Sequence, residues 1–273
     1  MSSTSENYSS RNPPPSNRQL LIIFGIFAGL IIGIVWLVMW LASSLVWLIP
    51  PSVEQQLGAL VVPAYERLAE PTSAQTTLNE LLDKLETNLP PQQRQNRDYQ
   101  VLYIPEDTVN ALAIPGDRII IYSGLLKQAQ SENELMMVLG HELGHFANRD
   151  HLRSLGRSVL MQIAIAYFLG DAGWIQSTAA SAIAAISSAQ YSQSQESQAD
   201  EVGLTLLQKT YGHVAGATDF FARLSQKQKV DIDFLATHPA PGRRVKELQR
   251  LIKQQGYRVG EKSPLSATLR LGG

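Results

Sequence analysis

The sequence contains no cysteine, and this absence narrows the chemistry that the chain can perform. It excludes disulfide bonds, thiolate ligands for a metal ion, a cysteine nucleophile and a lipid-modified cysteine near the N-terminus. Any metal site must therefore be built from histidine, aspartate and glutamate side chains. Histidine is itself scarce, with five residues in the whole chain.

The sequence also lacks an excess of charge of either sign. Its 23 basic and 24 acidic residues leave a formal net charge of −1. A chain without a strong overall charge has no general attraction to a polyanion, so we expect no nucleic-acid partner. The 273 residues are enough for one sizeable domain with additional segments. No feature of the sequence indicates an oligomeric state.

Residues 20–49 form a long run without a charged residue. A helix of this length would measure about 45 Å, which exceeds the roughly 30 Å hydrocarbon core of a bilayer. We therefore predict a transmembrane helix over residues 19–49, with a lipid bilayer as partner. A cleaved signal peptide is the alternative, but its apolar region would be only about 7–15 residues long. Residues 1–18, rich in Ser, Asn and Pro, are predicted to be a disordered tail.

Charged residues near the apolar run predict how it crosses the membrane. Arg11 and Arg18 precede the run, whereas mostly acidic residues follow it, at Glu54, Glu66 and Glu70. Basic residues close to a membrane helix tend to stay on the cytoplasmic side. We therefore expect a single-pass protein with a cytoplasmic N-terminal tail and the bulk of the chain on the extracytoplasmic side.

Residues 50–98 are predicted to form a helical spacer. Apolar residues recur there at helical spacing, with charged residues between them, at Leu78, Leu81, Leu82 and Leu85. Such a helix could bind a partner, but packing against the main domain is the simpler interpretation. We expect the main domain over residues 99–256 and a C-terminal tail over residues 257–273.

After the spacer the sequence first favours strands and then a helix. The apolar runs Val101–Ile104 and Arg118–Tyr122 predict two strands, and Pro115–Gly116 between them predicts a turn. Ser131 and Glu134 then form a capping box, in which the serine caps the backbone amide of residue 134 and the glutamate reaches back. A helix is therefore expected to begin at this point and to continue through the apolar residues that follow.

That helix leads directly into the motif H-E-x-x-H, which is formed by His141, Glu142 and His145. Residues four apart lie on one face of a helix, so the two histidines can bind one zinc ion. Zinc would lower the pKa of its water toward neutrality. Glu142 is then the candidate general base that takes the proton of this water and passes it to the leaving amine. We expect one zinc ion per chain.

A catalytic zinc site needs a third protein ligand, and the sequence offers two candidates. His151 follows His145 by six residues, the spacing of H-E-x-x-H-x-x-G-x-x-H peptidases, but those enzymes also carry a methionine turn well downstream. The last methionine here is Met161. Glu196 and Asp200 lie four apart on a predicted helix, so Glu196 could bind zinc while Asp200 orients a ligating imidazole. Between the two candidates we favour Glu196.

Four sequence blocks carry a resemblance to a known family. The blocks are NALAIPGDRIIIYSGLL (110–126), SENELMMVLGHELGHFANRDH (131–151), YSQSQESQAD (191–200) and THPAPGRRVKEL (237–248). In this order they are similar to the membrane-associated gluzincins, which include HtpX, the CAAX prenyl endopeptidases and mitochondrial and periplasmic quality-control peptidases. One departure is Gln193, where the family usually has arginine.

The resemblance implies an α+β, mostly helical fold. This fold is a zincin-type peptidase domain with a small sheet over the H-E-x-x-H helix, preceded by one N-terminal transmembrane helix. The resemblance also implies zinc endopeptidase activity, with His141, His145 and Glu196 as ligands and Glu142 as base. It further implies that the strand around Asn110–Ile114 is an edge that pairs with an extended substrate, through Asn110, Ala111, Leu112 and Ala113.

His238 is a further catalytic candidate. By composition alone, a histidine before a proline is usually a surface or capping residue, but the resemblance places this block over the active site. His238 could stabilise the oxyanion of the tetrahedral intermediate. It could instead bind zinc as a fourth ligand and hold the enzyme latent. We favour a residue that moves between the two positions.

The residues together predict a membrane-anchored zinc endopeptidase that cleaves misfolded or surplus membrane or envelope proteins. An edge strand binds main chain with little sequence selectivity, which suits such polypeptide substrates. The alternative is a membrane-anchored chaperone or binding module with a structural zinc site. Between the zinc blocks, the apolar residues 159–189 are expected to form a pair of helices that covers the active site. The alternative is that this pair enters the membrane as a second hairpin.

Overall fold

The computed structural model describes residues 15–48, 51–154, 183–186, 188–226 and 233–271. The chain divides into two compact units, Met1–Ser44 and Leu45–Gly273. Most of the apolar stretch 159–189 lies outside the described residues, so the helical pair expected there stays a prediction. Residues 183–186 of that stretch are helical.

The N-terminal unit contains one long helix, α1 (Asn17–Leu45). The helix begins where Ser16 Oγ accepts a hydrogen bond from the Gln19 amide at 3.3 Å. Its segment Asn17–Val38 is the one stretch in the described part of the chain that is long and apolar enough to cross a bilayer. Large apolar side chains such as Phe24 and Trp36 are exposed on it. This helix agrees with the predicted transmembrane segment in type and place.

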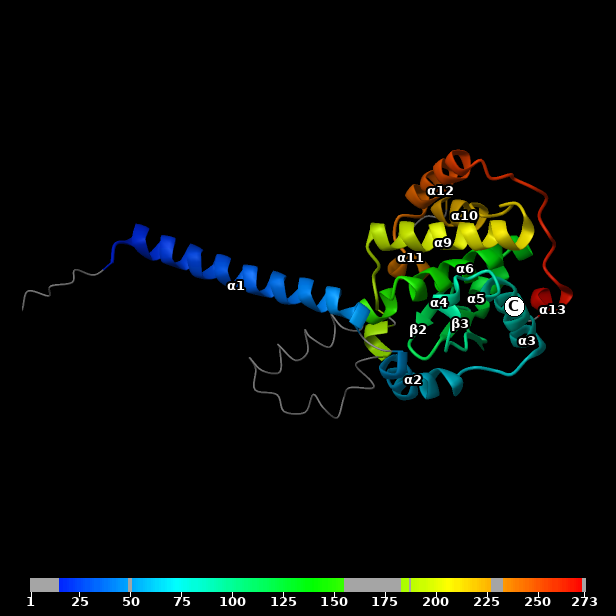
Figure 1. Cartoon of the computed structure of the whole chain (residues 1–273), viewed down its shortest axis with the longest axis horizontal. Helices are drawn as coiled ribbons and strands as arrows, with labels where there is room; N and C mark the ends of the chain where they lie inside the picture. Colours follow the sequence, from blue (N-terminus) through cyan, green and yellow to red (C-terminus); the bar gives the residue numbers. More distant parts are fainter. Residues whose placement is uncertain (1–14, 49–50, 155–182, 187, 227–232, 272–273) are drawn as a thin grey trace, which may run out of the picture. The chain divides into compact units, whose positions relative to one another are not determined.

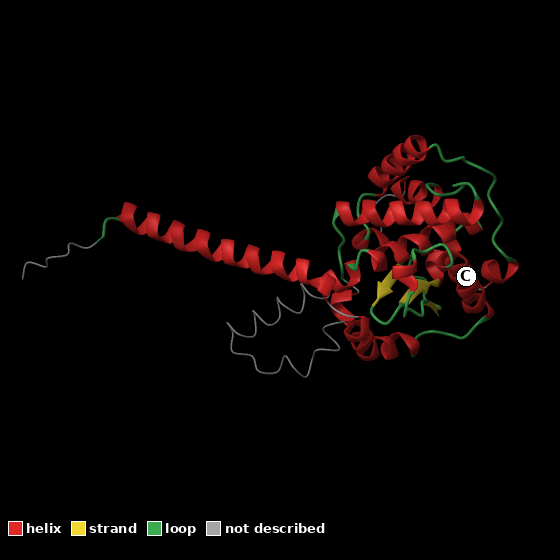
Figure 2. Ribbon diagram, in the orientation of Figure 1, coloured by secondary structure: helices red, strands yellow, loops and turns green. Residues whose placement is uncertain are grey.

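The second unit is built from short helices around a small sheet (Figures 1 and 2). Before the sheet lie η1 (Val46–Leu48), α2 (Pro51–Glu66), α3 (Ser73–Glu86) and α4 (Pro91–Arg94). The strands are β1 (Gln100–Ile104), β2 (Ala111–Ile114) and β3 (Arg118–Tyr122). The later helices are α5 (Ser123–Gln128), α6 (Glu132–Ala147), α9 (Gln193–Tyr211), α10 (Asp219–Gln226), α11 (Asp233–Thr237), α12 (Pro241–Gln255) and α13 (Ala267–Leu271).

The sheet has the strand order β1–β3–β2, with β1 parallel and β2 antiparallel to β3. Successive side chains of a strand point to opposite faces, so the sheet has two apolar faces. Val101, Ala113 and Ile119 face a core that includes α3 and α6. Leu102 and Ile120 face a second core that includes α2. Burial on both faces explains why the strands are uniformly apolar instead of alternating.

Helix α3 covers the β1 edge of the sheet. The Asn79 side chain accepts a hydrogen bond from the Val101 amide at 2.8 Å, and the Gln75 side chain accepts one from the Tyr103 amide at 3.0 Å. The same helix places Leu78 in the main core. The spacer helix therefore packs within the same compact unit as the sheet and closes one of its two edges.

The capped helix expected after residue 131 is α6. Ser131 Oγ accepts a hydrogen bond from the Glu134 amide at 3.3 Å, as predicted. The reciprocal half of the capping box is different, because the Glu134 carboxylate accepts from the Gln130 amide at 3.1 Å and pairs with Arg223. The glutamate therefore reaches back to the amide one residue before the predicted one.

Helices α6 and α9 lie side by side, and α6 separates α9 from the sheet (Figure 1). Small residues permit a very close approach of the two backbones. A Cβ added to Gly140 would lie 3.0 Å from the backbone of Gly203, and one added to Gly144 would lie 2.7 Å from the backbone of Ala199. This close packing brings side chains from the two helices into one cluster.

Candidate metal centre

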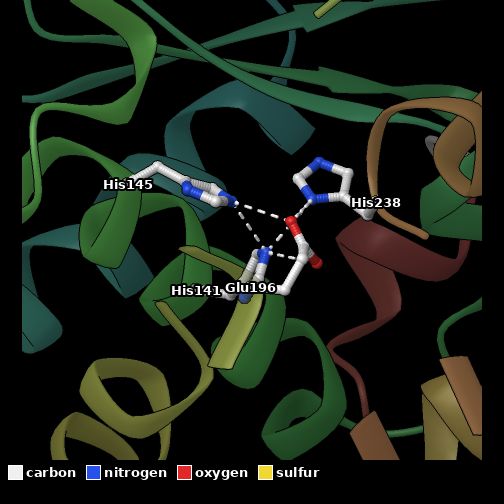
Figure 3. A group of neighbouring side chains, drawn as sticks. All are labelled: His141, His145, Glu196 and His238. Atoms are coloured by element: carbon white, nitrogen blue, oxygen red, sulfur yellow. Dashed lines mark hydrogen bonds and ion pairs between the residues drawn. The ribbon is translucent and has the colours of Figure 1, made fainter. Parts of the chain in front are cut away.

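Helices α6 and α9 and the end of α11 direct four buried side chains toward one point (Figure 3). His141 and His145 lie one turn apart on α6, and their Nε2 atoms are 3.1 Å apart. Glu196, in the first turn of α9, places Oε1 3.5 Å from His145 Nε2 and Oε2 3.7 Å from His141 Nε2. With His238, their ligand atoms all lie within 4.8 Å of one another.

The hydrogen bonds on the far side of each imidazole test whether this cluster fits a cation. His141 Nδ1 lies 2.9 Å from Asp200 Oδ1, and His145 Nδ1 lies 3.0 Å from Asp150 Oδ2. A carboxylate only accepts hydrogen bonds, so each Nδ1 carries a proton, and each Nε2 offers a lone pair to a metal, which displaces any proton there. Two lone pairs and the Glu196 carboxylate thus converge in a buried space, and a metal cation satisfies all three.

The surroundings of the cluster raise the pKa of His145 and lower the pKa values of His141 and Glu196. Burial lowers the pKa of His145, but hydrogen bonds with Asp150 and Glu196 outweigh this effect and raise it to about 10. Burial and the charge of Arg244 lower the pKa of His141 to about 4. Burial raises the pKa of Glu196, but the charges of His238 and Arg244 outweigh it and hold that pKa well below the usual value. Glu196 is therefore a carboxylate, the form that binds metals.

Arg244 of α12 supplies a buried positive charge beside the cluster. Its Nη2 lies 2.6 Å from Asp200 Oδ1, its Nε donates to Asp200 Oδ2 at 2.9 Å, and its Nη1 lies 2.9 Å from Glu196 Oε2. The guanidinium also stacks over the ring of Phe221, 3.9 Å from its centroid. Arg244 therefore fixes the carboxylate that orients His141 and balances the negative charge of Glu196.

His238 follows α11 directly and lies inside the cluster. Its Nδ1 is 3.0 Å from Glu196 Oε1 and 3.2 Å from His141 Nε2, and the side chain is completely buried. The backbone amide of His238 donates to the Phe234 carbonyl at 2.7 Å, and the Phe234 ring stacks on the imidazole. The geometry places this histidine where a fourth ligand would lie.

Glu142 stands beside the cluster without a hydrogen-bond partner. It is fully buried, and neither carboxylate oxygen has such a partner among the described residues. Its nearest ionisable neighbour of opposite character is His238, whose Nε2 lies 3.7 Å from Glu142 Oε1. A buried carboxylate left unpaired is costly unless it serves another molecule, such as a water at the metal.

Comparison with known proteins agrees with this geometry. Residues 72–252, about two thirds of the sequence, match the profile of Peptidase family M48. The chain belongs to this family. The match confirms the predicted metallopeptidase family, and the mostly helical fold with its small sheet is the one that the resemblance implied.

Three curated relatives of this M48 chain carry informative names. The putative beta-barrel assembly-enhancing protease of Vibrio cholerae is 27% identical over 74% of this chain and 45% of its own length. The mitochondrial metalloendopeptidase OMA1 of Arabidopsis thaliana is 27% identical over 55% of this chain and 31% of its own. Human mitochondrial OMA1 is 27% identical over 54% and 31%. The M48 chain therefore spans less than half the length of these relatives.

The alternative third ligand, His151, lies outside the cluster of the M48 chain. Its Nε2 is 2.8 Å from Glu54 Oε1 of α2, and both side chains are buried. Arg97 pairs with the same carboxylate at 2.7 Å. Burial raises the pKa of Glu54, but hydrogen bonds with His151 and Arg97 outweigh it and lower it to about 2. His151 thus serves a separate buried ion-pair network.

Three residues at the site escape sequence reasoning. Asp150 holds His145, Arg244 holds Asp200 and Glu196, and the Tyr191 ring stacks on His145 with centroids 3.8 Å apart. Asp150, Tyr191 and Arg244 each sit inside a block that carries the family resemblance, so their position was a usable signal, but nothing local showed their role. Arg244 in particular gave no sign of burial, because a basic residue on a helix is ordinarily exposed.

The remaining predicted residues also have defined places. Strand β2 forms the edge of the sheet opposite β1, so residues 111–114 lie at an edge. Asn110 precedes that strand and its Oδ1 accepts from the Ala111 amide at 2.9 Å. Gln193, where the family usually has arginine, accepts a hydrogen bond from Arg243 of α12. An arginine of α12 therefore contacts the position at which the family usually carries its own.

Proposed function

We propose that this protein is a membrane-anchored zinc endopeptidase with His141, His145 and Glu196 as metal ligands and Glu142 as general base. One observation carries the proposal: a buried carboxylate without a hydrogen-bond partner among the described residues lies beside two imidazoles and the carboxylate of Glu196. When bound, zinc would polarise the scissile carbonyl and activate a water molecule for attack. Asp200 and Asp150 hold the two imidazoles in the tautomer that presents Nε2.

The side chains divide the chemistry between them. Glu142 takes a proton from the attacking water and delivers it to the leaving amine nitrogen, because both oxygens are free to accept. Burial excludes bulk water and strengthens the charge interactions in the site. Arg244 keeps Asp200 ionised and so keeps the ring of His141 in place.

Strand β2 is the proposed substrate-binding edge. The Tyr122 amide donates to the Asn110 carbonyl, so alternate residues of this antiparallel ladder, beginning with 110, bond to β3. The amides and carbonyls of Ala111 and Ala113 therefore point away from β3, where they have no partner strand among the described residues, although residues 111–114 are buried in this structure. The Ala111 amide is held by the Asn110 side chain, which an extended peptide would displace. The other edge is covered by Asn79 and Gln75, so β2 is the edge that remains for a peptide.

The substrates we propose are misfolded or surplus proteins of a membrane or envelope. Recognition through main-chain hydrogen bonds accepts many sequences, provided that the substrate is locally extended. The apolar α1 helix would keep the enzyme at the bilayer, with the N-terminus in the cytoplasm and the peptidase domain on the extracytoplasmic side. The names of the relatives, a beta-barrel assembly-enhancing protease and a mitochondrial metalloendopeptidase, are consistent with work at membranes.

The second candidate function is a non-proteolytic binding module with a structural metal site. One observation favours this second function. His141, His145, Glu196 and His238 could all bind one metal ion, and four protein ligands close a site to water. A structural site, however, has no use for the unpaired carboxylate of Glu142, which would only destabilise it.

Removal of the metal separates the two functions. We expect the full chain in detergent to cleave an unfolded substrate such as casein. A strong chelator should abolish the cleavage and added zinc should restore it, because His141, His145 and Glu196 contribute to catalysis only by binding the metal. Fragment production followed by gel electrophoresis measures the result. Cleavage that persists in chelator, with zinc shown to be gone, would contradict the proposed mechanism.

His238→Ala tests whether His238 holds the enzyme latent. The Nδ1 atom lies 3.0 Å from Glu196 Oε1, so we propose that His238 is a fourth ligand in the resting state. Its removal should then raise basal proteolysis of an unfolded substrate. If the side chain instead stabilises the oxyanion, kcat should fall by about 10²–10³-fold. Initial rates of the variant and the unaltered chain decide the sign.

A further inference from the structure

A left-handed turn follows the H-E-x-x-H helix. Helix α6 ends at Ala147, and Arg149 has φ of 56°, a conformation that favours glycine and is unfavourable for a residue with a side chain. The next residue is Asp150, whose Oδ2 lies 3.0 Å from Nδ1 of the ligand His145. The turn at Arg149 therefore sets the direction from which Asp150 reaches the imidazole.

The Arg149 side chain is held by the segment that follows the long apolar helix in sequence. Its Nη1 donates to the Val46 carbonyl of η1 at 2.7 Å, and its Nη2 lies 3.5 Å from Glu54 Oε2 of α2. Arg149 and Glu54 are both buried, so water does not weaken these contacts. Glu54 is fixed in turn by Arg97 and His151.

We propose that Arg149, through Val46 and Glu54, is a positioning residue that holds the left-handed turn and thereby keeps Asp150 on the metal ligand His145. The proposal rests on the zinc site proposed above. Residues 149 and 151 point to Glu54 while residue 150 points to the cluster, so one short segment joins two buried networks. The segment between the apolar helix and the peptidase core thus becomes part of the support of the metal site.

Asp150 also has a hydrogen-bond partner in Gln195, which limits how far Asp150 can move when the Arg149 side chain is lost. Gln195 Nε2 donates to Asp150 Oδ1 at 2.8 Å, and Arg153 lies 3.5 Å from the same oxygen. These contacts fix the outer oxygen of Asp150, but they do not compensate for the unfavourable backbone at residue 149. Loss of the Arg149 side chain should therefore shift the turn toward right-handed conformations and move Asp150 away from His145.

A comparison of Arg149→Ala with Arg149→Gly tests whether the Arg149 side chain holds the left-handed turn for the metal site. Both variants lose the guanidinium, but only glycine adopts the left-handed conformation at no steric cost. We expect Arg149→Ala to weaken zinc binding by about 10–100-fold, the range known for partners behind metal-ligating histidines. Arg149→Gly should lie closer to the unaltered chain than to Arg149→Ala. Zinc affinity is measured on the full chain in detergent by competition with a chromophoric chelator.

A double-mutant cycle adds a second readout. Glu54→Gln should weaken zinc binding when Arg149 is present. It should add no further loss in the Arg149→Gly background, because the contact between Arg149 and Glu54 is already absent there. Gly256→Ala is the matched control, since Gly256 has φ of 64° at the end of α12, is exposed, and contacts neither Glu54 nor the cluster. It should lower the melting temperature of the chelated protein without changing zinc affinity.

Three outcomes would overturn the proposal. Arg149→Ala could bind zinc as tightly as the unaltered chain, or alanine and glycine could weaken binding equally. Either result would show that the turn is not held for the metal site. His141→Ala is the reference for the site itself, and retention of zinc by that variant would overturn the proposed zinc ligands as well. If His141→Ala loses zinc and the Arg149 variants do not, the zinc ligands stand and only the proposed role of Arg149 is refuted.

Discussion

Glu142→Gln is expected to abolish proteolysis and to leave bound zinc unchanged. The side chain is fully buried and both its oxygens lack hydrogen-bond partners among the described residues, so replacing the acid by an amide breaks no hydrogen bond of the fold. Glutamine has the same shape but cannot take a proton from water. The loss of a general base typically lowers kcat by about 10²–10⁴-fold. Turnover of an unfolded substrate and zinc content per chain are the two measurements.

A control on the same helix makes this result specific. Glu132, in the first turn of α6, accepts a hydrogen bond from Tyr211 at 2.5 Å and lies away from the cluster. Glu132→Gln should retain both zinc and turnover. If Glu142→Gln turned over substrate at a rate near that of the unaltered chain, the proposed base would be wrong and another group would have to accept the proton.

Glu196→Ala is expected to lose bound zinc, whereas His151→Ala is expected to keep it. Glu196 contributes a carboxylate within 3.5 Å of His145 Nε2, so its removal should cost more affinity than the about 10–100-fold lost with an outer partner. His151 is bound to Glu54 and lies outside the cluster. Its removal should leave zinc affinity within about tenfold, because it acts at most on the support of Asp150.

Metal content must be compared with folding in both variants. His151→Ala leaves Glu54 with one partner fewer in a buried network, so it should lower the melting temperature even though zinc stays bound. Equilibrium dialysis below the melting temperature of either variant gives the zinc content. A chain that lost zinc with His151→Ala and kept it with Glu196→Ala would belong to the other class of H-E-x-x-H peptidases.

The sequence by itself determined the local parts of this protein. The apolar run fixed a long helix, because no charged residue interrupts it. Apolar runs indicated strands at Val101–Ile104 and Arg118–Tyr122, where the structure has β1 and β3, and Ser131 indicated where α6 begins. The pair His141 and His145 followed from helical periodicity alone. Each of these features depends on residues within a few positions of one another, which is why a pattern could reveal them.

The tertiary structure alone decided how distant residues meet. Glu196 and His238 lie 55 and 97 residues beyond His141, and the sequence left His151 as a rival to the favoured third ligand Glu196. The close approach of α6 and α9 at Gly144 and Ala199 brings Glu196 to the cluster.

Buried charges were equally invisible in the sequence. Arg244 reads as an ordinary basic residue of an amphipathic helix, yet it is buried between Asp200 and Glu196. Glu54 reads as the first acidic residue of a spacer, yet it holds Arg97, Arg149 and His151. Such charges are stable only with partners from other elements, so the partners, and not the local sequence, decide that they are inside.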